Sequence, residues 1–134
     1  MPRVSEKNDV KKRFLRLDEA QRMAFPPAGS QLDAPESQGV YVIRGPDGRV
    51  LHVGRTHRGR RGLRQRLGNH LRGKSSFIRA WNHGDGGRLR QGCTYQYLVE
   101  DDPRFRALLE FYALAWHCPE HLGVGIARSI HDRD

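Results

Sequence analysis

Two β-prone runs on either side of a tight turn constrain the fold of this chain more than any other feature of its sequence. The first run, Gly39–Arg44, is rich in β-branched and aromatic residues, and the second, Arg49–Val53, contains two valines and a leucine. The residues Gly45-Pro46-Asp47-Gly48 separate the two runs, and glycine, proline and aspartate are typical of turns. This pattern predicts an antiparallel β-hairpin over residues 39–53.

A stripe of leucines follows the hairpin. Leucine recurs every four residues from Leu63 to Leu71, which predicts a helix over residues 63–72 with one buried face. Arg66 and His70 are also four residues apart and fall together along one edge of that stripe. Their side chains are therefore expected to lie side by side.

The other periodic segments predict two further helices and one more strand. Apolar residues at helical spacing predict an amphipathic helix over residues 9–24, which Pro26 and Pro27 would end, and a short helix is expected over residues 74–81. Alternating apolar residues predict a third strand over residues 93–100. A chain of 134 residues has room for one such domain.

The last long helix carries an acid among apolar neighbours. Asp102 is suited to cap this helix, with Pro103 at its first position and its end near His117. Glu110 lies within it, and a carboxylate is costly to bury unless a cation or a strong donor faces it. Glu110 is therefore either a metal ligand or one half of a structural salt bridge, to Arg106 or to a more distant arginine.

Positive charge is concentrated in one region of the sequence. Residues 44–90 hold thirteen lysines and arginines against two acids, whereas the whole chain has a formal net charge of +9. A block with so few acids favours a polyanionic partner, which is DNA or, as an alternative, RNA. No run approaches membrane-spanning length, and the N-terminus lacks the apolar core of a secretory signal, so we expect a cytoplasmic protein without a membrane partner.

The order and spacing of these motifs resemble the GIY-YIG nucleases. The pattern is Gly39-Val40-Tyr41, ten intervening residues and His52-Val53-Gly54, and then Arg66 and His70 on the leucine-striped helix. The resemblance covers roughly residues 38–122. His52 stands where the family usually has the tyrosine of its second motif.

The resemblance implies an α+β fold, in which a small GIY-YIG-like domain has a three-stranded antiparallel sheet flanked by helices. Residues 1–37 would form an N-terminal helix and linker, and residues 38–134 the catalytic domain. The implied catalytic residues are Tyr41, His52, Arg66, His70 and Glu110, with Glu110 also the ligand of a Mg²⁺ or Mn²⁺ ion. The residues expected to contact the nucleic-acid backbone are Arg55, Arg58, Arg60, Arg61 and Lys74.

Each implied role has a chemical reason beside the resemblance. Hydrolysis of a phosphodiester requires an oxygen nucleophile and compensation for growing negative charge, and Arg66 offers a forked pair of donors for phosphate oxygens. Tyr41 would relay a proton from the attacking water, with His70 assisting it or orienting a phosphate oxygen. Without the motif pattern, Tyr41 would be interpreted as a core tyrosine and His70 as a partly exposed helix histidine.

The sequence thus predicts a metal-dependent endonuclease that hydrolyses phosphodiester bonds in double- or single-stranded DNA. The alternative is a catalytically inactive GIY-YIG-like module that binds nucleic acid, because His52 replaces a tyrosine. A monomer and a homodimer fit the sequence equally well.

Overall fold

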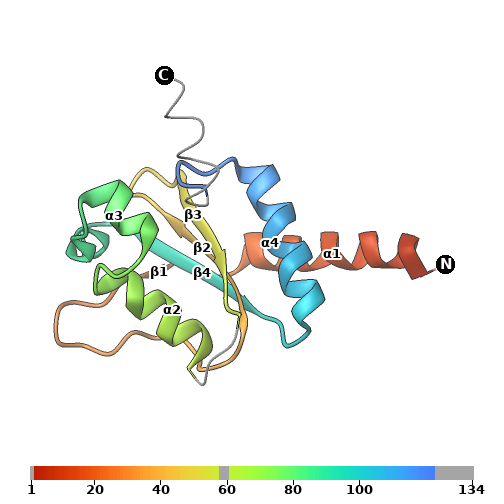
Figure 1. Cartoon of the computed structure of the whole chain (residues 1–134), viewed down its shortest axis with the longest axis horizontal. Coiled ribbons are helices and arrows are strands. Elements are labelled where there is room, and N and C mark those ends of the chain that lie inside the picture. Colours follow the sequence, from red (N-terminus) through yellow and green to blue (C-terminus); the bar gives the residue numbers. More distant parts are fainter. Residues whose placement is uncertain (1, 58–60, 123–134) are drawn as a thin grey trace.

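The computed structural model describes residues 2–57 and 61–122. One long helix comes first, three strands and then three short helices follow it, and a last strand and helix end this part of the chain (Figure 1). In chain order they are α1 (Pro2–Glu19), β1 (Met23–Ala24), β2 (Gly39–Arg44), β3 (Val50–Arg55), α2 (Gly62–Leu71), α3 (Ser76–Asn82), the 3₁₀ helix η1 (Gly86–Arg90), β4 (Thr94–Val99) and α4 (Pro103–His117). None of the described helices combines the length and the apolar character needed to cross a membrane.

The sheet contains four antiparallel strands in the order β1-β4-β2-β3, so the predicted three-stranded sheet is wrong by one strand. The predicted hairpin is confirmed as β2 and β3, and the third predicted strand as β4. The added strand, β1, consists of Met23 and Ala24 alone, which pair with β4. A strand of two residues has no periodicity to detect, and the helix expected over 9–24 includes these two residues.

A buried polar pair explains why α1 ends before β1. The amide of Gln96 in β4 donates to the carbonyls of Leu17, Asp18 and Ala20, at 3.3, 3.1 and 2.8 Å, and so satisfies the last carbonyls of the helix. Arg44 in turn donates from Nε to Gln96 Oε1 at 2.8 Å. Arg44 belongs to the basic block, yet its side chain supports the fold.

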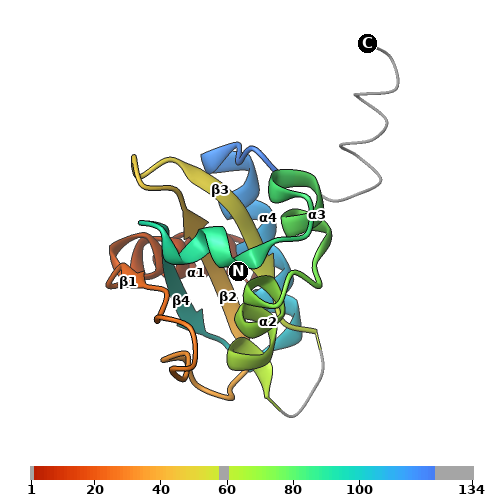
Figure 2. The same cartoon turned by 90° about the vertical axis from the view of Figure 1, so that its left-hand side faces the viewer.

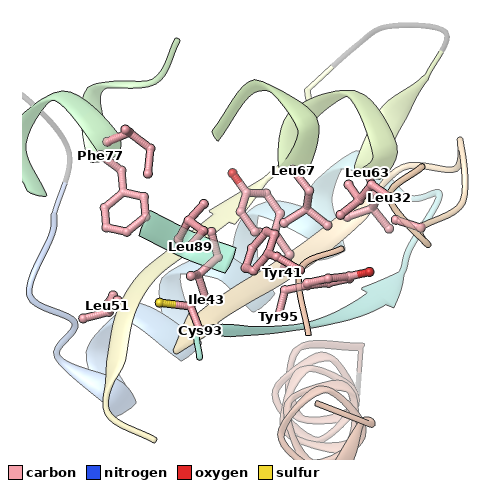
Figure 3. Packing of buried hydrophobic residues seen from close by; sticks show 13 residues of the cluster. Leu32, Tyr41, Ile43, Leu51, Leu63, Leu67, Phe77, Leu89, Cys93 and Tyr95 are labelled. Atoms are coloured by element: carbon pink, nitrogen blue, oxygen red, sulfur yellow. The ribbon is translucent and has the colours of Figure 1, made fainter. Parts of the chain in front are cut away.

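The two faces of the sheet carry separate apolar clusters because β2 is buried along its whole length. Tyr41 and Ile43 face α2 and α3, where Leu63, Leu67 and Phe77 cover them (Figure 3). Val40 and Val42 point to the opposite face. The residues that cover this second face come from α1 and α4 and are Phe14, Leu17, Leu109 and Ala113. Helix α1, horizontal in Figure 1, runs along the line of sight in Figure 2.

Local capping signals set the ends of α3 and α4. The carboxylate of Asp102 accepts from the backbone of Arg104 at 2.8 Å, and α4 spans Pro103–His117 as the sequence predicts. The hydroxyl of Ser75 accepts from Ile78 N, so α3 begins at Ser76 and not at Lys74.

Candidate active site

A tyrosine and a histidine from the predicted set meet beneath α2. Tyr41 in β2 and His70 in α2 share a hydrogen bond of 2.7 Å between Oη and Nε2. His70 Nδ1 lies 2.7 Å from Ser75 Oγ at the start of α3, so both ring nitrogens are engaged. His70 is fully buried, which contradicts the interpretation of a partly exposed helix histidine.

Gly54 in β3 makes room for the tyrosine ring. It lies directly opposite Tyr41 in the β2–β3 register. A Cβ atom at this position would come within 2.4 Å of Tyr41 Oη. This close approach is the physical reason for a glycine at the end of the His52-Val53-Gly54 motif.

Gly54→Ala is therefore expected to lower the free energy of unfolding by about 1–3 kcal/mol, because a methyl group there overpacks the site. Gly68→Ala in α2 is a matched control, since the added Cβ would meet only the flexible end of Arg72, and alanine favours a helix. Urea denaturation compares the two. A Gly54→Ala protein as stable as the wild type would contradict the packing of Tyr41 against this strand.

Burial keeps the Tyr41–His70 pair neutral at physiological pH. It raises the pKa of Tyr41 to about 12, and the positive charge of Arg66 opposes that rise only partly. Burial, followed by the charge of Arg66, lowers the pKa of His70 to about 3. Tyr41 is thus a hydroxyl and not a phenolate at neutral pH, so it is suited to orient a water molecule by hydrogen bonding.

Arg66 occupies the centre of the site. Its Nε is buried and has no hydrogen-bond partner among the described residues. Its positive charge acts on the pKa of five groups, namely Tyr41, His52, His57, His70 and Glu110. A cation close to so many candidate groups is well placed to receive an anion.

Glu110 reaches this group of residues from α4. Its carboxylate lies 3.6 Å from Arg55 Nε at the end of β3, and both side chains are about one-fifth exposed, at 18% and 21%. Burial raises the pKa of Glu110, and the charges of Arg55 and Arg66 oppose that rise. Arg106, considered as a partner from the sequence, instead donates to the carbonyls of residues 56, 57, 100 and 101. Within the described residues, no hydrogen bond reaches the Glu110 carboxylate.

His52 lies on the same face of the sheet as Tyr41 and is held between aromatic rings. Its ring stacks on Phe77 at 4.7 Å with an interplanar angle of 6°, and its centroid lies 5.0 Å from that of His70. His52 Nδ1 lies 3.1 Å from Nδ1 of His121, which follows α4. Sequence reasoning assigned no role to His121 or Ser75, and both reach the site through tertiary contacts.

Comparison with known proteins supports the fold that these motifs predicted. No protein-family model and no curated protein sequence matches the chain. Two crystal structures of the GIY-YIG N-terminal endonuclease domain of UvrC from Thermotoga maritima are similar to it, each with a TM-score of 0.50 and 18% identity. The match covers 86% of this chain and 96% or 97% of theirs. One of them is bound to magnesium, and the other is a point mutant bound to its catalytic divalent cation.

The chain has a GIY-YIG-like fold.

The basic residues of this GIY-YIG-like fold do not all lie on one free surface. Arg61 and Lys74, at opposite ends of α2, are exposed, although Arg61 also lies 3.8 Å from the carboxylate of Glu36. Arg55, in contrast, pairs with the partly buried Glu110. Arg58 and Arg60 lie outside the described residues. Beside Arg55, a cavity of about 350 Å³ opens between the end of β3 and the first turns of α4. Its lining residues are Arg55, Thr56, His57, Pro103, Arg106 and Ala107.

Proposed function

We propose that this chain is a metal-dependent endonuclease that hydrolyses phosphodiester bonds in DNA. The observation that carries the proposal is the meeting of four groups at the β3 edge of a GIY-YIG-like fold. These groups are the Tyr41–His70 pair, the Arg66 guanidinium, the Glu110 carboxylate and the His52 imidazole. They come from β2, β3, α2 and α4, and no requirement of packing alone explains so many ionisable groups at one place.

The residues present fit a metal ion that keeps most of its water. Among residues 2–57 and 61–122, no group of three histidines, cysteines or acids is placed to hold a metal ion. Glu110 would then be its main protein ligand, an arrangement that suits Mg²⁺ or Mn²⁺ better than Zn²⁺. Such an ion would supply charge stabilisation at the phosphoryl group and the leaving 3′ oxygen.

The side chains themselves would bind and orient the substrate. Arg66 would hold two phosphate oxygens, and Arg55 would contact a neighbouring phosphate at the rim of the 350 Å³ cavity. The neutral hydroxyl of Tyr41, fixed by His70, would orient the attacking water. Arg61 and Lys74 would contact the DNA backbone at a greater distance from the reaction.

A second candidate function is nucleic-acid binding without catalysis. It is favoured by the complete burial of Tyr41, which is 0% exposed, and by histidine in place of the second-motif tyrosine. This alternative requires salt-sensitive binding with no turnover.

Cleavage assays separate the two functions. We expect the wild-type chain to nick supercoiled plasmid in Mg²⁺ or Mn²⁺ and to stop when EDTA is added, with a parallel assay on single-stranded DNA. Binding that weakens with salt, without cleavage in any divalent cation, would establish the non-catalytic module instead. Competition by RNA and heparin measures how far the basic surface prefers DNA.

A further inference from the structure

The segment after α4 is attached to the free edge of β3. Strand β3 lies at the end of the sheet, so its outer backbone groups are available for pairing. His121 N donates to Leu51 O at 3.0 Å, and Glu120 N contacts Val50 O at 3.4 Å. These bonds bring His121 next to His52, the residue that follows Leu51.

A column of stacked groups fixes the other side of the His52 ring. Phe77 stacks on His52, and Trp81 stacks on Phe77 with centroids 5.4 Å apart and an interplanar angle of 17°. The guanidinium of Arg88 lies over Trp81, 4.4 Å from the ring centroid. With Phe77 on its face and His121 at its Nδ1, the His52 ring has little freedom to rotate.

The contact with His121 constrains where the His52 proton lies. Two nitrogens 3.1 Å apart share one proton, so one imidazole donates from Nδ1 and the other accepts. His52 Nε2 is buried and has no hydrogen-bond partner among the described residues. An unpaired buried N–H is rarer than an unpaired acceptor, which favours the tautomer with the proton on His52 Nδ1 and an accepting Nε2.

We propose that His52 Nε2 is the base that takes a proton from the attacking water, and that His121 is a positioning residue that holds the His52 ring in the accepting tautomer. This inference rests on the proposed nuclease function and assigns the base within it. Both nitrogens of His70 are already bonded, so His52 Nε2 is the free ring nitrogen of the Tyr41, His52 and His70 group.

The step is balanced in atoms and charge. The water oxygen forms a bond to phosphorus, one water proton moves to His52 Nε2, and the bond from phosphorus to the 3′ oxygen breaks. The leaving oxygen is protonated from solvent, and His52 later returns its proton to solvent. The pair thus supplies an oriented nitrogen base where the family usually has a phenol.

Two readouts test the proposal on the full chain. Long-range ¹H–¹⁵N NMR, assigned with His52→Gln, should show the proton of His52 on Nδ1 in the wild type. In single-turnover cleavage, His121→Leu should lose about tenfold in rate, part of the roughly 10²- to 10⁴-fold that a positioned base contributes. His121→Asn offers an oxygen near the position of Nδ1 and should restore most of the rate. His83→Asn, at an exposed position beyond α3, is the matched control.

The pH dependence of cleavage adds a signature that a purely structural role would not give. Burial, then His70, His121 and Arg66, lowers the pKa of His52 well below its usual range, while Tyr41 and Phe77 face it as neutral groups. A base works when deprotonated, so the rate should fall only as the pH drops through that low pKa. His121→Leu removes one cause of the lowered pKa of His52. The pH below which the rate falls, the acid limb of the pH profile, should therefore move toward neutral pH.

The outcomes distinguish this inference from the nuclease proposal. A wild-type chain that cleaves nothing overturns both. A chain that cleaves but has its His52 proton on Nε2, or has a His121→Leu variant with the wild-type rate and acid limb, overturns the role of the histidine pair alone.

Discussion

Glu110→Gln should abolish metal-dependent cleavage while the fold and DNA binding remain. The amide keeps the shape of the side chain but removes the charge that would hold a divalent cation. Because such an ion would supply several kcal/mol of charge stabilisation, we expect the cleavage rate to fall by about 10³-fold or more. Binding should stay equal or become tighter, since the change removes a negative charge beside Arg55 and Arg66. Plasmid nicking across a Mg²⁺ titration measures the first effect, and a filter or anisotropy assay measures the second.

Two comparisons make the Glu110 result specific. Glu19→Gln, an equally conservative change at an exposed position at the end of α1, should leave cleavage unchanged. If Glu110 were only the partner of Arg55, Glu110→Gln would keep wild-type cleavage and lose at most about 1 kcal/mol of stability, as is usual for a partly exposed ion pair. That result would remove the metal-binding role of Glu110.

Arg66→Lys should reduce cleavage by about 10²-fold although the positive charge is retained. A guanidinium presents two parallel donors to a phosphate, whereas an ammonium is a single point charge on a flexible stem. Because Arg66 lies near Tyr41, His52, His70 and Glu110, a shorter cationic head would also alter their alignment. We expect the loss in the single-turnover rate constant, with a smaller change in DNA affinity.

A matched substitution separates this effect from the general need for positive charge. Arg79→Lys, on the exposed side of α3, belongs to the same basic block and should be silent in both assays. Equal losses in Arg66→Lys and Arg79→Lys would show that only the field of the basic block matters. The forked contact would then have no place in the mechanism.

The helices and turns that depend on local signals could be predicted from the sequence. The Asp102 cap with Pro103 defines the start of α4, and the turn at residues 45–48 defines the β2–β3 hairpin. The spacing of Arg66 and His70 on a leucine-striped helix also follows from residues near one another in the chain. Local hydrogen bonds and helical periodicity act over a few residues, so their signatures survive in the sequence.

The pairings within the site depend on the tertiary structure. His52 and His121 are 69 residues apart in the chain, and Tyr41 and His70 are 29 apart, so no local pattern connects them. The same holds for Gln96, whose hydrogen bonds to the carbonyls at the end of α1 join residues 76 to 79 positions apart in the chain. It also holds for the two-residue strand β1. Sequence alone indicated which side chains are candidates for the proposed phosphodiester chemistry and on which elements they lie. The tertiary structure alone decided which of these side chains share a proton or interact through their charges, because it packs α2, α4 and residues 120–121 around the β3 edge. Burial and distance, and not residue type, set those interactions.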